Sequence, residues 1–108
     1  MTFSQRVHAQ LDERLMKAGY RPDSMAGVDE AAFRSASYEV VVYFDVANME
    51  TDARVRKIGD AGSWSHIREV VSHADWPPQC SGEPVQPRPE AEIIADLGHL
   101  IERLPSAG

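Results

Sequence analysis

Apolar side chains recur at helical spacing in two segments of the chain. Over residues 3–18 they form one stripe at about 100° per residue, with charged side chains opposite, and this pattern predicts an amphipathic helix. The stripe consists of Phe3, Val7, Leu11, Leu15 and Ala18. Thr2 and Gln5 are spaced as a capping box, and Gly19 is a typical stop signal. A second helix is expected over residues 89–104, with a stripe made of Ile93, Ile94, Leu97, Leu100, Ile101 and Leu104.

Between these helices the pattern changes to the alternation of a β-sheet. Tyr38–Val46 is the best-defined strand, because its even-numbered positions are apolar while its odd-numbered positions mix charged and apolar side chains. A mixed face of this kind is typical of the solvated side of an antiparallel sheet. A following strand is expected near Asp52–Ile58 and a weaker one over about Val28–Arg34, although residues 29–33 could instead form a helical turn.

The remaining segment predicts a short helix followed by an extended connector. The helix is expected over residues 64–74 with Ser63 as its cap, and Pro-rich residues 77–89 form the connector. The apolar side of this helix would consist of Trp64, Ile67, Val70, Val71 and Ala74. The sequence therefore predicts a single globular domain over residues 1–108 in the α+β class. A small antiparallel sheet of about three strands would pack against helices in the order α-β-β-β-α-α.

The distribution of charge bears on the kind of partner. The 108 residues contain 11 Lys and Arg against 17 Asp and Glu, a net charge of −6. Residues 1–58 hold 8 basic and 9 acidic side chains, a balance of −1, whereas residues 59–108 hold 3 and 8, a balance of −5. Nucleic-acid binding draws its affinity from Lys and Arg, so we expect no nucleic-acid partner. A basic protein is the better match to an acidic surface.

The cellular location is predicted from apolar runs and cysteine content. The longest apolar run, Val40–Phe44, is far shorter than the roughly 18 residues of a membrane span, and the first residues lack the apolar region of a signal peptide. Cys80 is the one cysteine and cannot form an internal disulfide, which favours a reducing compartment. We therefore expect a soluble cytoplasmic protein with no membrane partner.

Few residue clusters have the spacing that metal binding requires. His66, Glu69 and His73 would share one helical face, but histidines seven positions apart lie about 10 Å apart along a helix, too far to share one zinc ion. The acidic loop at residues 45–52 begins like a calcium-binding loop but lacks the glycine and the distal glutamate of such loops. We assign no metal ligands and no cofactor.

Signatures of catalysis are also missing from the sequence. It has no nucleophile elbow, no phosphate-binding glycine loop and no dinucleotide-binding fingerprint. Cys80 could act as a nucleophile only if a histidine lay beside it in space. We assign no catalytic residue, and we expect a protein without enzymatic activity while leaving that question open.

The mixed face of the predicted sheet is the strongest candidate for binding. Tyrosine and arginine together are enriched at protein interfaces. The candidate partner-binding residues are Glu39, Val41, Tyr43, Asp45, Arg54 and Arg56. Two other interpretations stay open: an ordinary solvated sheet face with ion pairs, or a sheet covered by helices on both sides.

The overall organisation resembles that of the small acidic proteins that neutralise bacterial toxins. The resemblance rests on the leading helix, the run Phe33–Asp45, the following Arg-Val-Arg strand and the acidic second half. It implies a non-enzymatic protein-binding module, an inhibitor of the immunity type or an adaptor. One alternative is a small enzyme or small-molecule-binding protein with a pocket between sheet and helices, using Tyr43, His66 or Cys80. Another is a homo-oligomeric accessory protein that pairs through the edge of the last strand or through the final helix.

Overall fold

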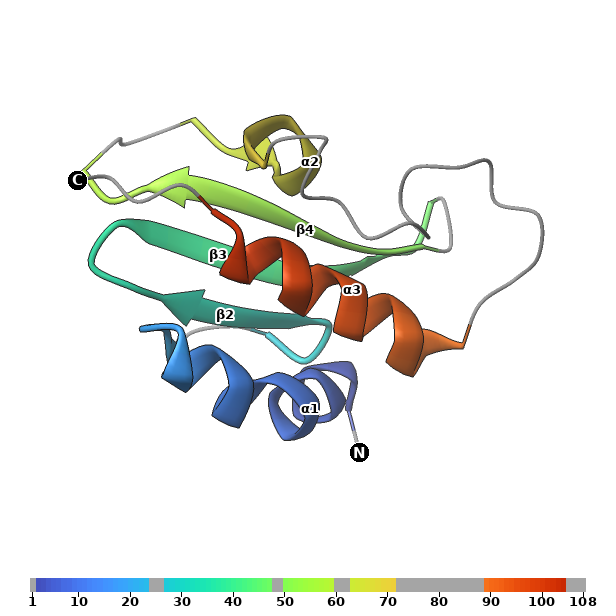
Figure 1. Ribbon diagram of the computed structural model, residues 1–108. Helices are drawn as coiled ribbons and strands as arrows, with labels where there is room; N and C mark the ends of the chain where they lie inside the picture. The colour runs from blue at the N-terminus through green and yellow to red at the C-terminus, as the bar shows by residue number, and fades with distance from the viewer. Residues whose placement is uncertain (1, 24–26, 48–49, 60–62, 72–88, 105–108) are drawn as a thin grey trace.

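The computed structural model describes residues 2–23, 27–47, 50–59, 63–71 and 89–104 (Figure 1). Its elements are α1 (Phe3–Lys17), β1 (Arg21–Asp23), β2 (Glu30–Arg34), β3 (Tyr38–Asp45), β4 (Glu50–Lys57), β5 (Ser65–His66), α2 (Ile67–Val70) and α3 (Glu90–Glu102). The fold is therefore α+β with an antiparallel sheet, as the sequence predicts. None of the helices in the described part of the chain combines the length and the apolar character that crossing a membrane requires.

The sheet has five antiparallel strands arranged in the order of the sequence, β1-β2-β3-β4-β5. Its centre is the pair β3 and β4, which match residue for residue from Tyr38↔Lys57 to Asp45↔Glu50. The helices α1 and α3 lie side by side over one face of this sheet (Figure 1). This arrangement leaves the sheet with one face turned toward the two long helices and one face turned away from them.

The core lies between the sheet and the two long helices. The predicted stripe of α1 is buried through Phe3, Val7, Leu11 and Leu15, and that of α3 is buried through Ile94, Leu97, Leu100 and Ile101. The sheet contributes alternate residues to the same cluster, among them Phe33, Val40, Val42, Ala53 and Val55. Burial of these apolar side chains is the main driving force for the fold.

The ends and the packing of α1 follow from specific local contacts. The Thr2 side chain accepts a hydrogen bond from the Gln5 backbone N–H while the Gln5 side chain accepts one from Thr2, so the predicted capping box is confirmed. Gly19 follows the helix with φ +94°, a conformation that favours glycine. Gly98 of α3 lets the two helices approach closely, because a Cβ there would lie only 2.8 Å from Leu11 Cδ2.

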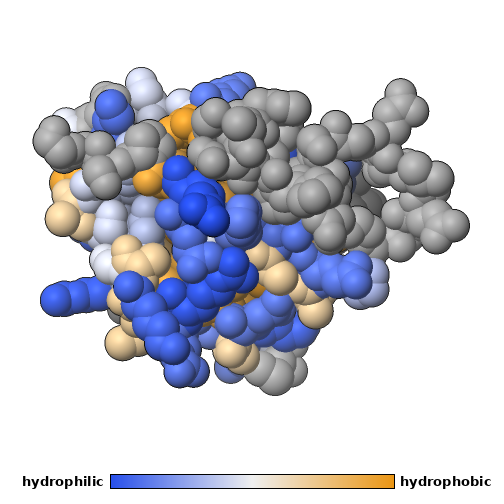
Figure 2. Space-filling view, in the orientation of Figure 1, coloured by the Kyte–Doolittle hydropathy of each residue, from blue (hydrophilic) through white to orange (hydrophobic). Residues whose placement is uncertain are grey.

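Two ion pairs join α1 to α3 at their solvent-exposed sides. Arg6 Nε donates to Glu90 Oε1 at 2.7 Å, and Arg14 Nε donates to Glu102 Oε1 at 2.7 Å. The surface over these helices is mainly hydrophilic, with separate apolar patches (Figure 2). Both glutamates belong to the acidic second half of the chain, so part of that negative charge is compensated within the fold.

The structure corrects the predicted number of strands from about three to five. β1 was not predicted because it has only three residues and contains Pro22, which interrupts the usual strand pattern. β5 lies inside the predicted helix 64–74; Ser65 and His66 pair with the outer edge of β4, so hydrogen bonds distant in sequence override the local helical pattern. The order of elements is accordingly α-β-β-β-β-β-α-α rather than α-β-β-β-α-α.

The predicted third helix is correspondingly shorter. Its helical part is α2, which covers Ile67–Val70 and is capped by His66 rather than by Ser63. Residues 72–74 of that prediction and the Pro-rich connector up to residue 88 lie outside the described residues, and so do His73 and Cys80.

Candidate protein-interaction face

The face of the sheet turned away from α1 and α3 carries the candidate site, and we call it the open face. The six residues predicted for partner binding all lie on it, at alternating positions of β3 and β4. Among the described elements, α1, α2 and α3 all direct buried side chains into the core on the other side. These three helices therefore do not cover both faces of the sheet, which was one of the interpretations left open by the sequence. The open face consists of Arg21, Asp23, Glu30, Ala32, Arg34, Glu39, Val41, Tyr43, Asp45, Glu50, Asp52, Arg54, Arg56 and His66.

The register of the strands arranges these side chains in four rows across the sheet. The first row is Arg21, Arg34, Glu39 and Arg56. The second is Asp23, Ala32, Val41, Arg54 and His66. The third is Glu30, Tyr43 and Asp52, and the fourth is Asp45 and Glu50. The open face is therefore basic at the edge formed by the first row and acidic at the opposite edge, formed by the fourth row.

Like charges stand directly opposite each other at both ends of this gradient. Arg21 pairs with Arg34 at the basic end, and Asp45 pairs with Glu50 at the acidic end. Directly opposed like charges destabilise an antiparallel sheet. Their presence at both ends indicates that this face is not arranged for stability alone.

Arginines and aromatic rings stack on one another across the middle of the open face. The guanidinium of Arg56 lies 4.4 Å from the centroid of the Trp64 ring, and that of Arg54 lies 5.3 Å from Trp64 and 5.3 Å from Tyr43. We call these four side chains the Arg-aromatic ladder. Val41 is only 8% exposed although it lies on the open face. The ladder is therefore an ordered layer with cation–π contacts.

Carboxylates fix the two guanidiniums of the ladder from the side. Arg56 Nη2 donates to Glu39 Oε2 at 2.6 Å, and Arg54 Nη2 donates to Glu30 Oε1 at 3.4 Å. The Nε of Arg54 is buried and has no hydrogen-bond partner within the described part of the chain. An unsatisfied buried donor costs free energy. The contacts that hold Arg54 are its stacking on Tyr43 and Trp64 and the hydrogen bond from its Nη2 to Glu30.

Asp52 joins the open face to the start of α2. Its Oδ2 lies 2.5 Å from His66 Nε2, and its Oδ1 lies 3.6 Å from Arg68 Nη1. The Arg68 backbone N–H donates to His66 Nδ1, so in neutral His66 the proton is on Nε2, which then donates to Asp52. His66, considered above as a metal ligand, is therefore engaged with a carboxylate, while Glu69 is exposed on α2.

Tyr43 contributes a phenol with a shifted pKa to the ladder. Its burial raises the pKa of its phenol above the ordinary value of 10.0, and the negative charge of Asp52 raises it further, while Arg54 opposes the shift. The phenol is thus neutral at physiological pH and can both donate and accept a hydrogen bond.

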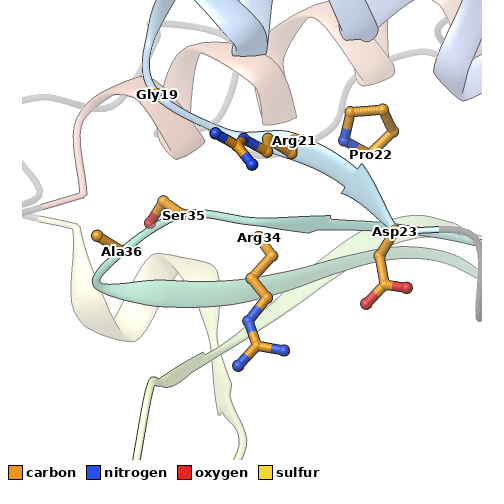
Figure 3. Close-up of a pocket in the computed structure, with 7 residues that line it drawn as sticks. All are labelled: Gly19, Arg21, Pro22, Asp23, Arg34, Ser35 and Ala36. Atoms are coloured by element: carbon orange, nitrogen blue, oxygen red, sulfur yellow. The ribbon is translucent and has the colours of Figure 1, made fainter.

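Two grooves among the described residues differ in position from the pocket considered in the sequence. An open groove of about 660 Å³ lies beside β1, and a smaller one of about 300 Å³ lies near the end of α3. Tyr43 and His66 line neither of these two cavities. The larger groove is lined by Gly19, Arg21, Pro22, Asp23, Arg34, Ser35 and Ala36 (Figure 3).

Several residues on the open face or stacked against it were not identified from the sequence. Trp64 was assigned to the apolar side of a helix, yet it precedes β5, is 38% exposed and stacks on both arginines of the ladder. Arg21 and Asp23 were missed together with β1. Glu30 and Arg34 could have been found, because alternation in the weakly predicted strand places them on the same face as Ala32.

Comparison with known proteins adds no identity to this geometry. The chain matches no protein-family model, no curated protein and no solved structure.

Proposed function

We propose that this protein is a non-enzymatic protein-binding module, an inhibitor of the immunity type or an adaptor, and that the open face is its binding surface. The observation that carries the proposal is the Arg-aromatic ladder on the side of the sheet away from the long helices. Trp, Tyr and Arg are the residue types that most often dominate the energy of protein interfaces.

The geometry of the ladder favours binding because its side chains are already ordered. Immobilising a long side chain at an interface costs about 0.5–1.5 kcal/mol, and a side chain held before binding avoids much of this cost. Arg56 is held by Trp64 on one side and by Glu39 on the other. The ladder can therefore receive a partner with little loss of conformational entropy.

The partner we propose is a basic protein. The acidic end of the open face, with Asp45 and Glu50 side by side, matches Lys or Arg side chains. The net charge of −6 would also steer a basic protein toward the chain and speed its association. Charge steering of this kind weakens as the salt concentration rises.

The proposal is tested by affinity capture from the native host, with Trp64→Ala as the test variant. Met16→Ala is the matched control, because Met16 is 60% exposed on α1 and lies away from the open face. We expect the wild type and Met16→Ala to retain a stoichiometric basic protein that Trp64→Ala loses. A partner retained equally by both variants, or no stoichiometric partner at all, would contradict the proposal.

A second copy of the chain is the other occupant that the open face could take. Light scattering during size exclusion distinguishes the two cases, because self-association through this face would give a dimer mass that falls to the monomer mass in Trp64→Ala. A wild-type monomer is the result expected for a module that binds a different protein.

A further inference from the structure

We propose that Arg21 and Arg34 form a binding site for a single phosphate group in the groove beside β1. The two residues are direct cross-strand partners in the register of β1 and β2. Side chains in that relationship start about 4.5–5.5 Å apart at Cβ. The two guanidiniums point in different directions in Figure 3, and rotation of these exposed side chains would bring both to one small ligand. Both arginines belong to the first row of the open face, but neither is part of the Arg-aromatic ladder, so phosphate binding can be tested separately from the proposed protein partner.

The positive charge of this arginine pair is only weakly compensated in the described part of the chain. Arg21 is exposed, and although its backbone pairs with Arg34, its side chain makes no hydrogen bond or ion pair with another described residue. Arg34 is 3.9 Å from Glu39 Oε1, whereas Arg56 is 2.6 Å from the other oxygen of the same carboxylate. Glu39 therefore compensates Arg56 more strongly than Arg34, and the pair retains an attraction for an anion.

The groove provides room for a small polar ligand. Its volume of about 660 Å³ falls within the range of small-molecule sites, about 300–1,000 Å³. Arg21 and Arg34 extend from neighbouring strands, and Ser35 and Ala36 lie in the adjoining turn (Figure 3). None of the described residues that line the groove is aromatic, which favours a charged group over an apolar ring.

The chemistry of two guanidiniums favours phosphate over carboxylate. Each guanidinium forks onto two oxygens, so two of them are best matched by a group with more than two oxygens. Asp23 also lines the groove, and its negative charge disfavours a polyphosphate or a nucleic-acid backbone. A single phosphate group fits this balance of charge, whether it belongs to a free small molecule or to a phosphorylated side chain.

The test is a nuclear magnetic resonance titration of the full chain at constant ionic strength. Inorganic phosphate, a phosphoserine peptide and the same peptide without phosphate are added in separate arms. We expect saturable shifts around Arg21, Arg34 and Ser35 with phosphate and with the phosphopeptide, and none with the unmodified peptide. Tighter binding of the phosphopeptide would assign the site to a phosphorylated protein, and tighter binding of inorganic phosphate would assign it to a small molecule.

Arg21→Gln and Arg34→Gln are the test variants, and Arg103→Gln is the control with the same change in net charge. Arg103 is exposed at the end of α3 and is not among the described residues that line the groove. Each test variant should weaken phosphate binding by about tenfold or more, because a charge-assisted hydrogen bond is lost. The absence of saturable shifts in the wild type, or an equal loss of affinity in Arg103→Gln, would overturn the proposal.

Discussion

The guanidinium of Arg56 lies 4.4 Å from the centroid of the Trp64 ring, and this contact attaches the segment before β5 to the face of β4. Trp64 also stacks on Arg54, so one side chain holds two charged neighbours. Each such contact contributes about 0.5–1 kcal/mol at a partly exposed site. Trp64→Ala should therefore lower the free energy of unfolding by about 1–2 kcal/mol.

Urea denaturation measures this change, with Met16→Ala as a control for loss of an exposed apolar side chain. Met16→Ala should change the free energy of unfolding by less than about 0.5 kcal/mol. Equal stabilities of the two variants would show that the ladder does not hold together in solution.

The central pair of strands and the face they share could be predicted from the sequence because strand alternation is local. Once Tyr38 and Val40 are assigned to the core, Glu39, Val41 and Tyr43 must lie on the other face. The two long helices were predictable for the same reason, since their stripes recur at a spacing that only a helix brings to one side.

The parts that could not be predicted depend on contacts between residues distant in sequence. His66 pairs with Arg54 of β4, and its side chain contacts Asp52, while the residues that follow it keep a helical pattern. The pairing of Arg21 with Arg34 depends on a strand of three residues, which is too short to show any period. The sequence therefore predicts Tyr43, Arg54 and Arg56 on one face, but not the stacking of Trp64 on them or the pairing of Arg21 with Arg34.

Gly98 is predicted to control the approach of α1 and α3. A Cβ at this position would lie 2.8 Å from Leu11 Cδ2, and Leu11 is only 1% exposed, so its side chain has little room to move. Gly98→Val should lower the free energy of unfolding by about 2–3 kcal/mol through overpacking. Gly98→Ala should cost less, because the gain in helix propensity of about 1 kcal/mol offsets part of the strain.

Gly27→Ala is the control for glycine replacement without crowding. A Cβ at Gly27 would meet no atom within 4 Å, and no positive φ is required there. Thermal and urea denaturation should place this variant within about 0.5 kcal/mol of the wild type. If Gly98→Val were as stable as Gly27→Ala, this would contradict the close packing of α1 against α3 at Gly98.

Thr2 is predicted to stabilise α1 through its capping box. Thr2→Ala removes the acceptor for the Gln5 backbone N–H and should cost about 1 kcal/mol in the free energy of unfolding. Thr2→Ser keeps the hydroxyl and should stay within about 0.5 kcal/mol of the wild type. Equal losses in both variants would indicate that the methyl group of Thr2, rather than its hydroxyl, matters.

Tyr20 is predicted to make the stability of the fold depend on alkaline pH. The side chain is only 6% exposed, and its burial raises the pKa of the phenol above 10.0, partly opposed by a hydrogen bond with Ser35. Between the unfolded and the folded pKa, the native state keeps a proton that the unfolded chain has lost. The stabilisation is therefore complete below about pH 10 and is lost as the pH rises through the folded pKa.

Tyr20→Phe removes this titration while keeping the ring. Because the variant has no phenol to ionise at this position, its stability should fall less than that of the wild type between about pH 8 and about pH 11. Urea denaturation at the two pH values measures the difference, and Met16→Ala, which changes no titrating group, should follow the wild type. If the phenol of Tyr20 stays neutral only in the folded state, the free energy of unfolding must fall more steeply with pH in the wild type than in Tyr20→Phe. An equal fall in both proteins would show that other groups govern the alkaline transition.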